Sequence, residues 1–299
     1  MITSKKHIMT LADILRNSSL SRPETEFLLA FLLHKSREFL LTHPETEITP
    51  QTYKKFKLLE DKRLKNWPIA YLTGSKEFYG RDFQVGPAVL TPRPETEQII
   101  DEIIKIIPSK KGTAPAKPIV IDLGTGSGAI IISLAKELKR LVPQTYRRAQ
   151  FSAVDISEPA LRVAKQNAAS HKAAVKIKFY QGDLLTPLKL NKRDLSQNDL
   201  IIAANLPYLT LKQIKKSPSI SREPLLALDG GADGLKYYQE LFEQLQDIPY
   251  HSATLFCEID PAQSKSIGVL AAKYFPKTES SLLKDLSGKN RLFILKTLI

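Results

Sequence analysis

The sequence contains 299 residues, of which 42% are hydrophobic and 25% are charged. This composition is typical of folded globular proteins and excludes disorder or a fibrous fold for the whole chain. The length is sufficient for two domains with buried cores. No apolar run approaches the roughly 20 residues of a membrane-spanning helix, and the N-terminal stretch lacks the apolar core of a signal peptide. We therefore expect a cytoplasmic protein that makes no membrane contact.

The chain is strongly basic, since 44 Lys and Arg residues against 31 Asp and Glu residues give a net charge of +13. Such an excess occurs in proteins that work close to RNA and equally in proteins with an ordinary lysine-rich surface, so proximity to the ribosome or to RNA stays open. The single cysteine, Cys257, excludes an internal disulfide, and the five histidines show no metal-ligand spacing. We expect no bound metal.

Helical patterns dominate residues 1–76, which we interpret as a small helical domain. Ser21 is a plausible N-cap because Pro23 and Glu24 follow it in the first helical turn. Apolar residues recur near helical spacing in three stretches, 10–15, 22–33 and 49–65.

The pattern changes twice after this domain. Residues 77–92 are rich in aromatic and β-branched residues bracketed by Gly80 and Gly86, which predicts a β-hairpin linking two domains. Residues 93–299 then alternate between strand and helix, which is typical of an α/β fold with an open, mostly parallel, Rossmann-like sheet. The expected helices are 95–107, 128–138, 158–169, 233–245 and 261–274. The expected strands are 119–123, 151–154, 176–180, 200–204 and 254–259, with 281–286 and 291–298 as an antiparallel edge hairpin.

A glycine-rich turn follows the first strand of this second region. Its residues Gly124, Thr125, Gly126, Ser127 and Gly128 stand between a strand and a helix, where a backbone without side chains can approach a ligand closely. Asp155 ends the next strand, and a carboxylate there can accept hydrogen bonds from two ribose hydroxyls. The two features together predict a nucleoside cofactor and leave NAD and S-adenosylmethionine open.

The fourth strand ends in Asn205, Leu206, Pro207 and Tyr208. The Asn205 oxygen and a backbone carbonyl are suited to accept both hydrogens of a planar NH2 group, while Pro207 stiffens the chain and the Tyr208 ring can pack on a planar substrate. Hydride transfer has no use for such a motif. It therefore favours methyl transfer from S-adenosylmethionine to an amide or aromatic amine, achieved mainly by positioning.

Several segments, taken together, resemble one known family. The most specific is Leu90-Thr-Pro-Arg-Pro-Glu-Thr-Glu97, preceded by Pro68-Ile-Ala-Tyr-Leu-Thr-Gly74 and Phe78-Tyr-Gly80. In this order they resemble the peptide chain release factor glutamine N5-methyltransferases, often called the HemK or PrmC type. The resemblance covers nearly the whole chain.

This resemblance implies an activity and further site residues. The substrate would be the glutamine of the Gly-Gly-Gln loop in class I release factors, with S-adenosylmethionine as cofactor and the helical domain helping to grip the factor. Asp183 and Leu184 match the position that contacts the adenine ring, beside the site at residues 124–128 and Asp155. Arg93 and Glu95 would line the substrate pocket, although they could instead pair with each other. We also expect a monomer.

The sequence departs from the family at Leu206, where Asn-Pro-Pro-Tyr is usual. Asn-Leu-Pro-Tyr resembles instead the motif of ribosomal RNA adenine N6-methyltransferases, which is our alternative function. Those enzymes lack the segment 90–97 that is present here. The backbone carbonyl of Leu206 can still serve as an acceptor, without the fixed φ of proline. A non-catalytic RNA- or ribosome-binding protein and a nicotinamide dehydrogenase remain further rivals.

Overall fold

The computed structural model describes residues 9–107, 117–190, 195 and 198–298. The described chain divides into two compact units. The first comprises the chain up to Gly74 together with Pro218–Arg222, and the second comprises Ser75–Ser217 and the chain from Glu223 onward.

The first unit is helical, and its helices are α1 (Leu11–Asn17), α2 (Arg22–Leu33), α3 (Arg37–Thr42), α4 (Pro50–Leu64) and α5 (Ile69–Thr73). The predicted helices over 10–15, 22–33 and 49–65 are confirmed as α1, α2 and α4. Ser21 is the N-cap of α2, and its backbone N–H donates to the Glu24 carboxylate. The two short helices α3 and α5 were not predicted, because one or two turns carry too little periodicity to stand out.

One buried carboxylate connects the end of α1 to α4. The side chain of Glu60 on α4 accepts hydrogen bonds from the Ser18 hydroxyl at 2.7 Å and from the Ser19 backbone N–H at 2.8 Å. Lys57 pairs with the same carboxylate. The end of α1 is therefore anchored to α4 beside an apolar core that includes Leu11, Leu28, Leu29 and Phe56.

A β-hairpin of β1 (Ser75–Phe78) and β2 (Arg81–Gln84) opens the second unit. Phe78 and Phe83 are its fully buried side chains, and they pack against α6 (Glu97–Ile106) and α7 (Ala129–Leu141). The hairpin strands end at Gln84, so residues 85–92 form a connection without strand structure.

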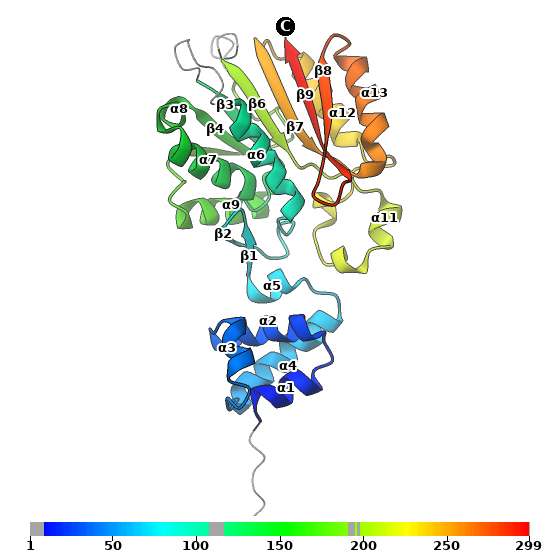
Figure 1. The fold of residues 1–299 in the computed structure, drawn as a ribbon. Coiled ribbons are helices and arrows are strands. Elements are labelled where there is room, and N and C mark those ends of the chain that lie inside the picture. Colours follow the sequence, from blue (N-terminus) through cyan, green and yellow to red (C-terminus); the bar gives the residue numbers. More distant parts are fainter. Residues whose placement is uncertain (1–8, 108–116, 191–194, 196–197, 299) are drawn as a thin grey trace, which may run out of the picture. The chain divides into compact units, whose positions relative to one another are not determined.

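The main sheet has seven strands in the order β5-β4-β3-β6-β7-β9-β8 (Figure 1). Strands β3 to β7 are parallel, whereas β9 runs antiparallel between β7 and the edge strand β8. Their bounds are β3 (Ile119–Leu123), β4 (Gln150–Asp155), β5 (Ile177–Gln181), β6 (Asp199–Ala204), β7 (Ser252–Glu258), β8 (Glu279–Lys284) and β9 (Asn290–Leu298).

Alternate side chains of the central strands feed two separate cores. Val120, Ile201 and Phe256 face one layer, which contains α6, α7 and part of α9 (Glu158–Ser170). Ile121, Ile202 and Leu255 face the other layer, which contains α12 (Lys236–Gln246) and α13 (Ser264–Tyr274). Because both faces are covered, β3, β4 and β6 are almost wholly buried. The predicted Rossmann-like α/β fold, with its antiparallel edge hairpin, is confirmed.

Two short helices, α8 (Pro143–Arg148) and α11 (Leu211–Lys215), were not predicted. The expected loop at 108–118 lies mostly outside the described residues. No helix of the described residues is long and apolar enough to cross a membrane.

Candidate active site

A cavity opens at the carboxyl edge of the sheet, where the strand order changes direction between β3 and β6. Ligands of open α/β sheets bind at such points because the loops after neighbouring strands diverge there. The cavity encloses about 830 Å³ of empty space, its open mouth included. Part of its lining comes from residues at or just after the ends of four adjacent strands, namely Gly124, Gly126, Asp155, Asp183, Leu184, Asn205, Leu206 and Pro207. We call it the switch-point cavity.

The glycine turn after β3 lies close to the motif after β6. Gly124 has a φ of +66°, and a Cβ on it would lie 3.3 Å from the Leu206 side chain and 3.9 Å from the Asn205 carbonyl oxygen. A side chain would thus be strained and would crowd the cavity wall. The turn itself is held by Thr125, whose backbone N–H donates to the Val154 carbonyl at 3.0 Å.

Asp155 presents a carboxylate at the end of β4 that the backbone holds in place. The Gly126 N–H donates to Oδ2 and the Ser157 N–H donates to Oδ1, both at 2.8 Å. Burial raises the pKa of Asp155, while the two backbone donors lower it. Each oxygen has a second lone pair and Asp155 lines the cavity, so the group can accept two hydroxyls of a ligand.

Asp183 and Leu184 line the same cavity after β5. Leu184 has a φ of +45°, an uncommon conformation for a branched residue. Its backbone is nonetheless fixed on the C-terminal side, where the Leu185 N–H donates to the Gln244 side chain at 2.8 Å. The strained turn brings the Leu184 side chain into the apolar wall of the cavity.

The loop before α12 packs directly against the backbone of the segment Asn205–Tyr208. A Cβ on Gly230 would lie 2.5 Å from the Pro207 carbonyl oxygen and 2.7 Å from the Tyr208 Cα. The Gln263 side-chain amide also donates to the Tyr208 carbonyl at 2.8 Å. The motif backbone therefore rests directly on glycine backbone.

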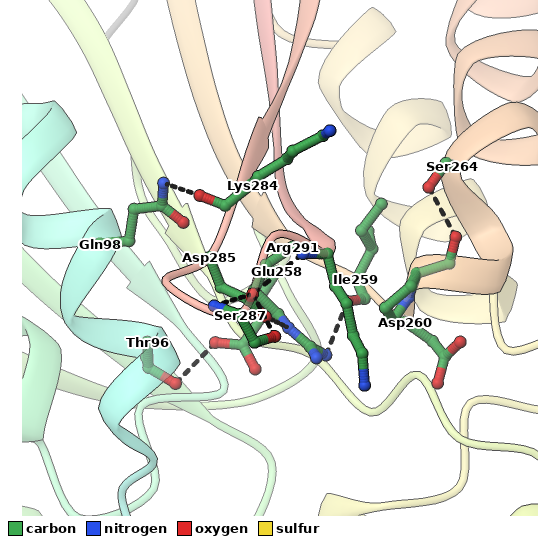
Figure 2. Close-up of polar contacts among 12 residues, drawn as sticks. Thr96, Gln98, Glu258, Ile259, Asp260, Ser264, Lys284, Asp285, Ser287 and Arg291 are labelled. Atoms are coloured by element: carbon green, nitrogen blue, oxygen red, sulfur yellow. Dashed lines mark hydrogen bonds and ion pairs between the residues drawn. The ribbon is translucent and has the colours of Figure 1, made fainter.

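Buried polar side chains complete this site behind Asn205. Thr96 Oγ1 donates to Glu258 Oε2 at 2.6 Å, and Tyr208 OH donates to Glu258 Oε1 at 2.9 Å. Asn205 Nδ2 donates to Thr96 Oγ1 at 3.0 Å. Figure 2 shows Thr96 at the start of α6 reaching the carboxylate at the end of β7. Burial raises the pKa of Glu258, opposed by these hydroxyl donors and the Arg291 charge.

Arg93 forms its ion pair with Glu223, so the alternative in which it pairs with Glu95 is wrong. The Glu223 side chain is 1% exposed, and it also accepts the Thr91 N–H at 3.2 Å. Glu95 is exposed. Neither Arg93 nor Glu95 lies in the wall of the switch-point cavity.

The structure does not bring every predicted residue to the cavity wall. Thr125 and Ser127 are buried behind the turn, where the Thr125 hydroxyl donates to Asp122 at 2.6 Å and the Ser127 carbonyl accepts from Asn167. Gly128 opens α7, and a Cβ there would lie 2.8 Å from Ile132. These three residues shape the turn, and Tyr208 contacts Glu258 rather than the cavity.

Sequence reasoning assigned no site role to several residues that the structure brings here. Residues 88–90, Leu226 and Tyr237 line the cavity. Glu258 resembles part of a later motif of the same family, but no role was predicted for it, although it is the one acidic residue in the otherwise uncharged strand β7. Cys257 beside it is fully buried, as expected of a small apolar residue. Among the described residues, no group of three or more His, Cys, Asp or Glu side chains could hold a metal ion.

Comparisons with known proteins agree on both units. A family model described as the PrmC N-terminal domain matches residues 10–74, and one described as a methyltransferase domain matches residues 116–257. The release factor glutamine methyltransferase of Moorella thermoacetica is 35% identical over 275 residues, which cover 91% of this chain and 90% of the relative. The Bacillus subtilis protein of the same name is 35% identical over 269 residues, 89% of this chain and 88% of the relative.

A solved structure supports the fold alone. The catalytic domain of human METTL16, in complex with an RNA hairpin, shares 12% identity with a TM-score of 0.53 and covers 90% of both chains. The family rests instead on sequence identity that extends through both units. The expected resemblance is confirmed, and this chain belongs to the release factor glutamine methyltransferase family.

Proposed function

We propose that this protein transfers a methyl group from S-adenosylmethionine to the side-chain amide nitrogen, N5, of the glutamine in the Gly-Gly-Gln motif of class I release factors. One observation carries this proposal: Asn205 lies in the wall of the same cavity as Gly124, Gly126 and Asp155. An acceptor for a planar NH2 group thus adjoins a pocket suited to a nucleoside cofactor. The names of the relatives support the release factor as substrate.

The switch-point cavity fits S-adenosylmethionine. Asp155 offers two carboxylate oxygens to ribose hydroxyls, Leu184 offers an apolar surface to the adenine ring, and Asp183 stands beside it. The absence of side chains at Gly124 and Gly126 leaves room for the methionine portion. When bound, S-adenosylmethionine supplies an activated methyl group on a sulfonium sulfur.

The residues after β6 would hold the reacting amide. The Asn205 oxygen and the backbone carbonyl of Leu206 each accept one N–H of the glutamine, which fixes the plane of the NH2 group and raises the electron density on its nitrogen. Pro207 restricts the backbone of this acceptor pair, and the Tyr208 hydroxyl, bound to Glu258, anchors the end of the motif outside the cavity wall. Arg93 and Glu95 lie outside the cavity wall and would contact the release factor beside it, with Arg93 fixed by Glu223.

The remaining assignments concern the whole chain. We propose that residues 1–76 recognise the release factor, with 77–92 as linker and 93–299 as the methyltransferase domain. Because release factors act at the ribosome, the reaction would take place in the cytoplasm, and the basic charge would favour proximity to ribosomal RNA. We propose a monomer, which sedimentation of the purified protein would test.

The decisive experiment offers labelled S-adenosylmethionine to a class I release factor and to naked ribosomal RNA in parallel. We expect label on the release factor, and mass spectrometry should place one methyl on the Gly-Gly-Gln glutamine. Label only on RNA, removed by nuclease, would support the adenine methyltransferase alternative suggested by Leu206. No transfer to either substrate, with salt-sensitive RNA binding retained, would support a binding protein.

Asn205→Ala tests the proposed mechanism within the same assay. This variant loses the side-chain oxygen that accepts the amide hydrogen, so turnover should fall strongly. Unchanged turnover would refute the role of Asn205.

A further inference from the structure

We propose that Thr96 and Glu258 are positioning residues that fix the orientation of the Asn205 amide, so that its oxygen and not its nitrogen faces the substrate. This inference rests on the proposed function, in which Asn205 must accept an N–H of the glutamine. It adds two side chains that do not touch the substrate and that lie 162 residues apart in the sequence.

The three side chains form one directed chain of hydrogen bonds. Asn205 Nδ2 donates to Thr96 Oγ1 at 3.0 Å, and Thr96 Oγ1 donates to Glu258 Oε2 at 2.6 Å. They come together because Asn205 follows β6 and Glu258 ends β7, two neighbouring parallel strands in which Ala204 pairs with Cys257. Thr96 directly precedes α6, and Figure 2 shows its hydroxyl reaching the Glu258 carboxylate.

Counting hydrogens gives the chain its direction. An ionised Glu258 carboxylate has no hydrogen to donate, so the single hydroxyl hydrogen of Thr96 is committed to it. The Thr96 oxygen can then only accept, and the Asn205 NH2 group is the donor that meets it. The Asn205 oxygen is thereby turned away from Thr96. If the amide were flipped, its oxygen would face another oxygen with no hydrogen between them.

Burial strengthens the preference for the orientation in which the Asn205 NH2 group faces Thr96. Thr96 is 4% exposed and Glu258 is 2% exposed, so water does not compete for these groups. Burial raises the pKa of Glu258, and the acidic neighbour Glu95 raises it further. The Thr96 and Tyr208 hydroxyls, which donate to the carboxylate at 2.6 and 2.9 Å, and the charge of Arg291 lower the pKa and favour the ionised form.

The turn after β8 holds Arg291 in place. Arg291 Nη1 donates to the Ile259 carbonyl at 3.2 Å, and Nε donates to Asp285 Oδ2 at 3.3 Å (Figure 2). The same turn is attached to α6, since Gln98 Nε2 donates to the Lys284 carbonyl at 3.1 Å. The carboxylate, the hydroxyl and the supporting charge are thus fixed relative to one another.

The same carboxylate also fixes the other end of the motif. Tyr208 and Asn205 are the last and first residues of the four-residue segment, and both depend on Glu258, one directly and one through Thr96. The Glu258 carboxylate therefore sets both the orientation of the Asn205 amide and the position of the Tyr208 ring.

The test compares Thr96→Val with Thr96→Ser, using the full-length protein and a class I release factor. Valine keeps the shape but removes the hydroxyl, so the Asn205 amide is free to flip, and kcat should fall about tenfold or more. The affinity for S-adenosylmethionine, measured by calorimetry, should stay within about twofold, because Thr96 does not line the cavity. Serine keeps the hydroxyl and should restore most of kcat.

Thr91→Val is the matched control. Thr91 is also buried and lies in the same segment, but its hydroxyl has no hydrogen-bond partner among the described residues. Its replacement by valine should leave kcat within about twofold of the wild-type value.

Glu258→Gln tests the second member of the chain. The new NH2 group can donate to Thr96, which frees the hydroxyl hydrogen to point at the Asn205 oxygen. We expect this variant to lose kcat like Thr96→Val, and the double variant to lose little more, since both changes break one chain. Additive losses would overturn the inference.

The other outcomes are distinguishable. If wild-type protein transfers no methyl to the release factor, the proposed function fails. If the wild type is active and Thr96→Val is equally active, or if Thr96→Ser is as impaired as Thr96→Val, the positioning role is refuted while the function stands.

Discussion

Asp122 shows how strongly a single buried carboxyl can respond to the fold. It precedes Leu123, the last residue of β3, and has no exposed surface. Burial raises its pKa from 3.8 to about 7, with Thr125 as an opposing hydrogen-bond donor. The nearby charge of Asp155 raises the pKa further. Near neutral pH the folded protein therefore holds a proton on Asp122 that the unfolded chain releases.

Asp122→Asn should remove a pH dependence of stability. With a raised pKa, the stabilisation that protonated Asp122 provides is complete below 3.8 and is lost as pH rises through about 7. Relative to the asparagine variant, the wild type should lose up to about 4 kcal/mol of unfolding free energy over this interval. Urea unfolding of both proteins at several pH values measures it. A difference that does not change with pH would contradict the assignment.

Asp155→Ala should weaken the binding of S-adenosylmethionine. The variant loses both carboxylate acceptors and releases the Gly126 and Ser157 N–H groups, so calorimetry should show a Kd increase of about tenfold or more. Glu158→Ala is the control, because Glu158 is exposed and pairs with Arg162 across one turn of α9. Wild-type affinity in Asp155→Ala would remove the ribose assignment.

At the scale of elements, the loop before α12 and the motif after β6 are packed as two backbones in contact. Gly230 has backbone atoms of Pro207, Tyr208 and Gly234 within 2.9 Å of where a Cβ would stand. No side-chain rotation can relieve such contacts, so one element must move. The precision of the site therefore depends on the packing of two loops and not only on the residues within one.

Gly230→Ala should separate these loops. We expect a loss of about 1–3 kcal/mol in stability, as for other overpacked sites, and a marked loss of methyl transfer. Gly268→Ala is the control, since Gly268 lies within α13 with nothing inside 4 Å of its Cβ position. It should raise stability by up to about 1 kcal/mol. Thermal unfolding and methyl-transfer assays measure both effects. Unchanged stability and activity in Gly230→Ala would refute the proposed packing of the two loops.

At the scale of the whole molecule, the net charge of +13 is the sum over all charged residues and acts on partners at a distance. Buried ion pairs use part of the charge, as Arg93 does with Glu223 and Arg81 with Glu137. Many Lys and Arg residues of the described parts of the chain are exposed and can attract acidic partners. Such attraction acts on encounter rates and is screened by salt over about 10 Å at 0.1 M.

Raising the salt concentration from about 50 to about 300 mM should therefore raise the KM for the release factor several-fold and leave kcat nearly unchanged. Steady-state kinetics at saturating S-adenosylmethionine measures both constants. The KM for S-adenosylmethionine serves as the internal control, because its cavity is mostly enclosed by backbone and apolar groups. A salt-independent KM for the release factor would show that the basic surface has no part in its capture.

Most of the architecture was predictable from the sequence. The strands β3 and β6 are largely apolar runs, and the helix predicted over 158–169 is α9, which Ser157 caps by accepting the Ala160 N–H at 3.3 Å. Element ends moved by a few residues, as for the helix predicted over 95–107, which begins as a 3-10 turn at Pro94–Thr96 before α6. The short helices were missed because their few residues carry no distinct period.

The sequence by itself determined the fold class, the place of the glycine turn, the end of β4 at Asp155 and the motif Asn205–Tyr208, because each depends on backbone preferences and periodicity within a few neighbouring residues. Only the tertiary structure decided that Arg93 pairs with Glu223 and that Thr96 joins Asn205 to Glu258, contacts between residues 109 to 162 positions apart. A buried donor or acceptor takes whichever partner the packing brings within about 3 Å. Local pattern does not encode that partner, since it is chosen when distant strands and loops meet at one edge of the sheet.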